Sequence, residues 1–291
     1  MGEQLKGTLL VILAGVFYGT TGYFATILNE EGLSVEDLLL WRFLGSALLL
    51  APIVPSFFKR RVSPQQWRTL GLFFVLGALC YSLGTILYFH SSFIIGTGLS
   101  MVLYFSYPLL VVAWLAFIEK RLPSFLTILS VMLLIVGCGM IGLGDKTETN
   151  WYGFVLAILS GMSYGIYIIQ SKARAHVILP IFSTFAVCLG CAVSFAGYIV
   201  ATGQVFYIPS DPAVIGYLFL FSSMGTILPV LCLMQGVKLI SATKTAIYLV
   251  LEPVTVLWIG VVCLGELIGM VQAVGICIVL SSALIIQVVR D

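Results

Sequence analysis

GTLLVILAGVFYG at residues 7–19 and GFVLAILSGMSYG at residues 153–165 are near copies of each other, and this duplication decides the fold. Seven identical positions recur 146 residues later: Gly7, Leu10, Ile12, Leu13, Gly15, Tyr18 and Gly19 match Gly153, Leu156, Ile158, Leu159, Gly161, Tyr164 and Gly165. The sequence Gly-Thr-Ile-Leu at 84–87 returns at 225–228. Because the shift is half of the chain, we expect two related units, residues 1–145 and 146–291.

The composition places both units in a lipid bilayer. Hydrophobic residues make up 60% of the 291 positions and charged residues only 9%, whereas about a quarter of an ordinary soluble domain is charged. A net charge of +2 does not indicate a nucleic-acid partner. The seven cysteines fall in apolar segments, and the pair Cys188 and Cys191 lacks the further ligands that a zinc site needs. We expect neither a metal nor a cofactor.

Apolar segments predict ten membrane-spanning helices, since a helix needs about 20 apolar residues to cross the hydrocarbon core. The predicted spans are 7–28, 35–54, 69–90, 96–118, 123–142, 151–171, 180–202, 213–234, 243–264 and 268–288. Five spans in each half is an odd number, so the second half crosses the bilayer in the opposite sense to the first. The predicted fold is therefore an all-α integral membrane protein with two inverted five-helix repeats around a central cavity.

The charges predict which side of the bilayer each loop faces. With the N-terminus inside, the inner loops hold 12 of the 14 lysines and arginines, and the outer loops hold eight of the 12 acidic residues. By the positive-inside rule, both termini are cytoplasmic.

The last two spans resemble a known family. Leu251-Glu252-Pro253-Val254, then Leu264-Gly265-Glu266-Leu267, Gln272 and Gly275, resemble the "EPV…LGE…Q..G" run of the EamA-type branch of the drug/metabolite transporter superfamily. Tyr107-Pro108-Leu109-Leu110 through Glu119-Lys120-Arg121 repeats it, and Trp41-Arg42-Phe43 resembles the family's arginine in its second helix. One departure is that Pro108 to Glu119 is two residues shorter than Pro253 to Glu266. The resemblance implies a ten-helix basket whose cavity is lined by helices one, three, four, six, eight and nine, and which carries small metabolites, often amino acids, commonly outward.

Glu252 is the sharpest candidate for function, because an acidic residue near the middle of a span usually faces protein or water. A carboxyl group that exchanges a proton there would couple transport to a proton gradient; the alternative is that it only satisfies backbone groups freed by Pro253. Lys244, Tyr248 and Glu252 recur every four residues and would share one face of a continuous helix, with about 12 Å between the two charges. Lys244 is therefore a candidate charge at the cavity mouth, and the two charges could accommodate the two ends of a zwitterion. The alternative is that Lys244 is a helix-end lysine reaching the headgroups.

Tyrosines gather in the spans expected to line the cavity. Candidate substrate-binding residues are Glu252 and six tyrosines, Tyr18, Tyr88, Tyr104, Tyr107, Tyr164 and Tyr248. A ring of hydroxyls suits an amphipathic solute better than a bare ion. For any one of them, packing or the interfacial belt is the alternative. Arg42 is a candidate cavity charge or a structural lock between helices, and His90 is a candidate proton relay or a hydrogen-bonded group at a helix end.

These observations predict a secondary transporter, not an enzyme, that moves a small organic solute across the cytoplasmic (inner) membrane by alternating access. An amino acid or related solute, exported and with the proton as candidate coupling ion, is the leading prediction, in a monomer or weak dimer. A phosphorylated-sugar or nucleotide-sugar antiporter is the alternative, although it would need several buried cations. A multi-span membrane enzyme is a third, although His90 and His176 fall on opposite sides of the bilayer.

Overall fold

A computed structural model describes residues 2–58, 62–95, 97–105, 107–120, 122–142, 150–249, 251–264 and 269–288. Every regular element in these ranges is a helix. Seven helical stretches are long and apolar enough to cross a membrane: Gly2–Glu30, Val35–Ser56, Pro64–Ile95, Trp151–Arg174, Pro180–Thr202, Pro212–Leu239 and Ala242–Cys263. The shorter apolar helices Tyr107–Ile118, Phe125–Met140 and Met270–Ser282 complete the ten predicted spans.

The first half contains five spans, several of which consist of more than one helix. They are α1 (Gly2–Gly19) with α2 (Thr21–Glu30); α3 (Val35–Leu50) with η1 (Ala51–Ile53) and α4 (Val54–Phe58); α5 (Pro64–Val75) with the π-helical turn η2 (Leu76–Tyr81) and α6 (Ser82–Ile95); α7 (Thr97–Tyr104) with α8 (Tyr107–Glu119); and α9 (Phe125–Gly142). The predicted unit boundary at 145/146 lies outside the described residues.

The second half repeats this order. Its spans are α10 (Trp151–Arg174); α11 (Pro180–Thr202); α12 (Pro212–Ser222) with the π-helical turn η3 (Ser223–Ile227) and α13 (Leu228–Leu239); α14 (Ala242–Tyr248) with α15 (Leu251–Leu264); and α16 (Met270–Val288). The third span of each half thus contains a π-helical turn, and the fourth span of each half is divided in two.

Local sequence signals explain where the helices begin and end. Ser63 caps α5 in a capping box with Gln66, and Asp211 caps α12 with its side chain. In both helices a proline follows at the first helical position, where a backbone N–H is not needed. Gly203 ends α11 with φ +67°, a conformation that favours glycine.

The packing shows that the two halves run in opposite senses. The start of α1 meets the end of α13, because a Cβ added at Gly7 would lie 2.7 Å from Leu239 Cβ. In the same way the start of α10 meets the end of α6, since a Cβ at Gly153 would lie 2.5 Å from Ile95 Cγ2. Spans alternate in direction within each half, so α1 would run parallel to α13 if the halves were not inverted. The first and third spans of opposite halves are antiparallel, which establishes the inverted repeat.

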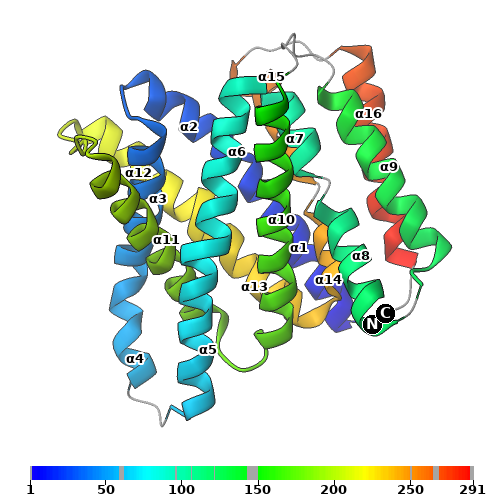
Figure 1. The fold of residues 1–291 in the computed structure, drawn as a ribbon, viewed down its shortest axis with the longest axis horizontal. Coiled ribbons are helices and arrows are strands. Elements are labelled where there is room, and N and C mark those ends of the chain that lie inside the picture. The colour runs from blue at the N-terminus through cyan, green and yellow to red at the C-terminus, as the bar shows by residue number, and fades with distance from the viewer. Residues whose placement is uncertain are drawn as a thin grey trace.

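Hydrogen bonds between the halves obey the same symmetry. Ser46 on α3 donates to the carbonyl of Ser222 at 3.0 Å, and Cys191 on α11 donates to the carbonyl of Gly77 at 3.2 Å. The two donors, Ser46 and Cys191, are 145 positions apart, and so are the two acceptors, Gly77 and Ser222. Each bond is therefore the repeat-related copy of the other. α9 packs along α16 on the other side of the bundle (Figure 1). The chain begins and ends at one edge of the bundle, the lower edge in Figure 1, which we call the terminal face; the opposite edge is the far face.

The outside of the bundle is apolar. Large hydrophobic side chains on several helices are exposed, among them Leu48, Leu79, Trp114, Phe117, Trp258 and Leu284. Such a surface is stable in hydrocarbon and not in water, so these side chains are the lipid-facing positions of the predicted spans.

Candidate transport site

A cavity of about 430 Å³ extends from the middle of the bundle to the far face. The ends of α2 and α6 and the start of α3 surround its outer part, and α15 contributes its inner end (Figure 1). The described residues that line it are Tyr18, Thr21, Gly22, Ala25, Thr26, Asn29, Glu30, Val35, Leu38, Arg42, Tyr81, Gly84, Thr85, Tyr88, Phe89, Ser92, Phe93, Met101, Tyr104, Phe105, Tyr164, Glu252 and Val256. They come from the first, second, third, fourth, sixth and ninth spans.

Two expectations about these spans need correction. The second span was expected outside the cavity, yet α3 contributes Val35, Leu38 and Arg42. The eighth span was expected to line it, yet none of its described residues does. The physical reason is that Gly45 lets α3 pack closely against α12: a Cβ at Gly45 would lie 2.5 Å from Ser222 Oγ. The same helix carries Arg42, which reaches from the cavity lining to η3 of the eighth span.

Tyrosines form the inner end of the cavity. Tyr81 donates a hydrogen bond to the hydroxyl of Tyr18 at 3.2 Å, so the third and first spans meet there. The ring of Tyr164 lies 5.6 Å from that of Tyr104 and 5.2 Å from that of Tyr107. Edge-to-face and tilted contacts of this kind fix the rings while the hydroxyls near the cavity stay available to a solute. The described lining of the cavity ends at this tyrosine cluster and at Glu252.

Glu252 lies at the inner end of the cavity, in the first turn of α15. The ninth span is divided there, since α14 ends at Tyr248 and α15 begins at Leu251. The fourth span is divided at the corresponding place, between Tyr104 and Tyr107. Pro108 and Pro253 follow the two divisions. Proline has no backbone N–H to donate to the carbonyl four residues earlier, which is that of Tyr104 and that of Leu249. Paired discontinuous helices in two inverted halves are typical of substrate sites in transporters.

Glycines bring the first span of each half close to these divisions. A Cβ at Gly15 on α1 would lie 3.2 Å from the carbonyl oxygen of Leu249, and one at Gly161 on α10 would lie 2.7 Å from that of Tyr104. Small residues allow such close approach between helix backbones. Because the contacts are repeat-related, the glycines of the duplicated stretch have the same packing role in both halves.

Arg42 is buried beside the cavity, and its contacts hold the eighth span. Its Nε donates to Thr226 Oγ1 and its Nη2 donates to the carbonyl of Gly225, both at 2.8 Å and both in η3. The guanidinium also lies about 5 Å from the ring centroids of Phe43 and Phe221. A π-helical turn displaces backbone groups from regular bonding, and Arg42 satisfies one of them. The structural and cavity-charge interpretations of Arg42 are thus compatible.

The other candidates lie away from the cavity lining. Tyr107 is fully buried and donates to the carbonyl of Ala246 at 3.1 Å. Tyr248 is 2% and Lys244 8% exposed, and neither lines the cavity. Lys244 and Tyr248 belong to α14 and Glu252 to α15, and residue 250 between these helices lies outside the described residues.

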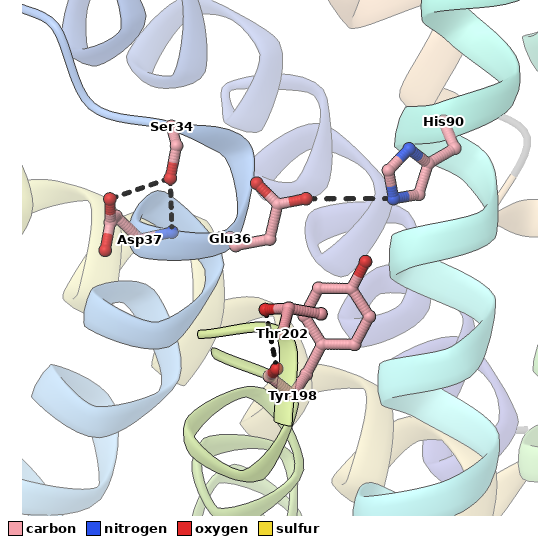
Figure 2. A network of polar contacts seen from close by, with 6 residues as sticks. All are labelled: Ser34, Glu36, Asp37, His90, Tyr198 and Thr202. Carbon is pink, nitrogen blue, oxygen red and sulfur yellow. Dashed lines mark hydrogen bonds and ion pairs between the residues drawn. The ribbon is translucent and has the colours of Figure 1, made fainter. Parts of the chain in front are cut away.

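His90 lies at the far face, where its Nε2 is 3.8 Å from Glu36 Oε1 (Figure 2). Its side chain is 42% exposed, so this pair joins α6 to α3 in contact with solvent. Next to it, Ser34 caps α3 by accepting from the N–H of Asp37 and donates to the Asp37 carboxylate. Asp37 in turn accepts from the N–H of Tyr207, and this bond holds the loop after α11 against α3.

Several lining residues were not predicted from the sequence. Thr21, Thr26, Thr85, Ser92 and Asn29 add hydroxyl and amide groups to the cavity wall. The available signal was their spacing, because Thr21 lies three positions after Tyr18 and Thr85 three positions before Tyr88, which places each pair on one helix face. Among the described residues, no group of three or more His, Cys, Asp or Glu side chains is arranged to hold a metal ion.

Ten apolar helices in two inverted halves, with divided helices meeting at a polar cavity, define a multi-pass membrane transporter. The sequence profile of the EamA-like transporter family matches residues 5–143 and 151–288, one match in each half, so the chain belongs to this family.

Similar proteins agree with this assignment. The uncharacterized transporter YcbK of Bacillus subtilis is 22% identical over 94% of this chain and 90% of that protein. The uncharacterized inner membrane transporter YicL of Salmonella typhimurium is 24% identical over 99% of this chain and 97% of that protein. One solved crystal structure shares the fold with a TM-score of 0.79 and 14% identity, covering 98% of this chain and 99% of that one.

Proposed function

We propose that this transporter carries a small zwitterionic solute, an amino acid or a related compound, through the cavity by alternating access. The observation that carries the proposal is that Arg42 and Glu252 line the same tyrosine-walled cavity. A solute with an ammonium group and a carboxylate matches Glu252 and Arg42, whereas a bare ion would leave one of them unmatched. Glu30, the second acidic residue of the lining, lies at the far face.

The environment of Arg42 supports recognition of a carboxylate. A guanidinium has five N–H donors, and the bonds to Thr226 and Gly225 use two of them. These bonds and the two flanking rings hold the group in one orientation, so little conformational freedom is lost when a solute binds. The apolar part of the solute would contact Tyr88, Phe89 and Phe93 in the outer part of the cavity.

A phosphorylated or nucleotide-linked sugar is a poorer match. Recognition of phosphate groups normally uses several cationic donors. Arg42 is the one cation among the described residues of the lining, and Lys244 is not part of it. A membrane enzyme remains the least supported alternative, because the chain matches a family of transporters in both halves.

Glu252 is the candidate for proton coupling, with export as the proposed direction. Its position at the inner end of the cavity allows the carboxyl group to bind a proton in one state and the solute ammonium in another. The positive-inside distribution supports cytoplasmic termini, and the relative YicL is named as an inner membrane protein, which supports the cytoplasmic membrane as the location.

The test is counterflow into proteoliposomes that contain the purified protein. For each amino acid tested, three unlabelled compounds inside the vesicles are compared: the free α-amino acid, its methyl ester and the amine that remains after decarboxylation. Free amino acids should drive uptake of the labelled amino acid, while the ester and the amine should drive about tenfold less, as expected for the loss of one charge-assisted hydrogen bond. Counterflow supported by sugar phosphates or nucleotide sugars and by none of the amino acids would refute the proposal.

A further inference from the structure

The cavity occupies only one of two symmetry-related places. On the first span it is lined by Tyr18, Thr21, Gly22, Ala25, Thr26, Asn29 and Glu30. Shifted by the 146 positions of the repeat, these correspond to Tyr164, Tyr167, Ile168, Ser171, Lys172, Ala175 and His176 on and after α10. On the second span the shift is 145 positions, the separation of the equivalent residues Ser46 and Cys191. The counterparts of Val35, Leu38 and Arg42 are therefore Pro180, Ser183 and Val187. An inverted repeat places this second set towards the terminal face.

The second set is closed where the first is open. Thr21, Gly22 and Ala25 are partly or fully exposed, whereas their counterparts Tyr167, Ile168 and Ser171 are at most 1% exposed. On α11, Ser183 and Val187 are 3% and 0% exposed, as buried as their counterparts Leu38 and Arg42 at 2% and 4%, so the difference between the halves lies on the first span of each. The two halves therefore differ in packing although they share one fold.

Polar groups in the closed region are incompletely bonded. Within the described part of the chain, Tyr167 and Ser171 lie one turn apart on α10 and their hydroxyls have no hydrogen-bond partner outside this pair. On the neighbouring α11, Thr184 Oγ1, also fully buried, has none. A buried hydroxyl without a partner is unfavourable, and a state of the protein that admits water or a ligand to these hydroxyls would remove that cost.

Two lysines close the mouth of this region at the terminal face. Lys238, near the end of α13, donates from Nζ to the carbonyl of Ile178 at 2.9 Å, which joins the eighth span to the loop between α10 and α11. Lys172 on α10 donates to the carbonyl of Lys238 at 3.4 Å. Lys172 is the counterpart of Thr26, which lines the open cavity. A position whose counterpart lines the opening at the far face is thus bonded to the eighth span at the terminal face.

We infer that Tyr167, Ser171, Ser183 and Thr184 line a second, latent vestibule that opens to the terminal face, and that the Lys238–Ile178 bond is the latch that keeps it shut. The vestibule takes the same zwitterionic solute from the tyrosine cluster, and the lysines at its mouth attract the carboxylate end. This inference rests on alternating access as proposed above, but its geometry comes from the repeat and the buried hydroxyls.

Cysteine accessibility tests the vestibule without any solute. The seven native cysteines are replaced by alanine, with serine at Cys191 because its Sγ bonds to the carbonyl of Gly77. Single cysteines are then introduced by Ser171→Cys and by Ala25→Cys, its counterpart in the open cavity. Ser160→Cys is the matched control: Ser160 is also on α10 and fully buried, but its hydroxyl is bonded to the carbonyl of Gly84 at 2.6 Å.

Membrane vesicles of both orientations are treated with a charged, membrane-impermeant maleimide. The cysteine at 25 should react from the far face and the cysteine at 171 only from the terminal face. Adding Lys238→Met should accelerate the reaction at 171 about two- to tenfold, the shift that the loss of one net hydrogen bond allows, and leave the control at 160 unreactive. Lys172→Met provides a second latch variant if Lys238→Met fails to fold.

Three results would overturn the inference. The cysteine at 171 could react from the far face, it could remain unreactive with both latch variants, or the cysteine at 160 could accelerate in parallel with it, which would indicate local unfolding. No solute is present in the cysteine experiment. A failure of amino acid counterflow therefore does not change the cysteine reactivity, and unreactive cysteines do not decide whether amino acids are transported.

Discussion

Gly161→Ala tests whether the duplicated glycines position the divided fourth helix. A Cβ at this site would lie 2.7 Å from the carbonyl oxygen of Tyr104 and 3.5 Å from the Cβ of Tyr107. The first distance is shorter than any ordinary carbon–oxygen contact, and a backbone carbonyl at a helix end cannot rotate away as a side chain can. The two helices must therefore separate, at a cost of about 1–3 kcal/mol for overpacking.

Gly165→Ala is the matched control, one turn further along α10. There the added Cβ would approach no atom closer than the 3.5 Å to Val111 Cγ2, which is ordinary van der Waals contact. Both substitutions gain about 0.5–1 kcal/mol because alanine favours the helix over glycine. This gain cancels in the comparison, so the difference between the two variants should be about 1–3 kcal/mol, with Gly161→Ala the less stable.

Thermal unfolding of the two purified variants in one detergent measures this difference. The apparent melting temperature of Gly161→Ala should lie about 2–8 °C below that of Gly165→Ala. Since Tyr104 lines the cavity, half-maximal transport should also require a higher solute concentration in Gly161→Ala. Equal melting temperatures, or a lower one for Gly165→Ala, would refute the claim that these glycines set the distance between α10 and the divided helix.

Three further predictions concern the site and the topology. Glu252→Gln should abolish the response of transport in proteoliposomes to an imposed pH gradient while the melting temperature stays close to that of the wild type; an unchanged response would make Glu252 a structural residue. Tyr164→Ala should weaken solute affinity more than thermal stability, whereas the reverse order would assign the ring to packing. Cysteines introduced at positions 60 and 146 should react with an impermeant reagent from opposite sides of the membrane, and reaction from the same side would contradict the span count.

The sequence predicted the helices well because hydrophobicity and turn signals are local. The α11 boundaries Pro180 and Thr202 coincide with the predicted span, since Pro180 starts the helix and Gly203 ends it. The divisions after Tyr104 and Tyr248 were missed, because the apolar pattern continues across them. Pro108 and Pro253 were the available signals, because a proline is tolerated in the first turn of a new helix and disrupts the interior of a continuous one.

The candidate site was predicted in part. Tyr18, Tyr88, Tyr104, Tyr164, Glu252 and Arg42 line the cavity, whereas Tyr107, Tyr248, Lys244 and His90 do not. The sequence could not separate the two groups, because the contacts that place a side chain in the cavity or in the packed core come from segments that are distant along the chain. Tyr107, for example, is withdrawn from the cavity by its bond to Ala246, 139 positions away.

The sequence alone determined an integral membrane protein of ten helices in two inverted halves, since hydrophobic length, charge in loops and internal repetition can be read along the chain. Only the tertiary structure decided which face of each helix meets the cavity, that Arg42 holds the π-helical turn of the eighth span, and that the described cavity lining reaches the far face. The two halves are similar in sequence, so the repeat predicts two equivalent openings. Which of these openings is closed depends on packing between distant segments, such as the bond from Lys238 to the carbonyl of Ile178, and such packing cannot be predicted from local sequence.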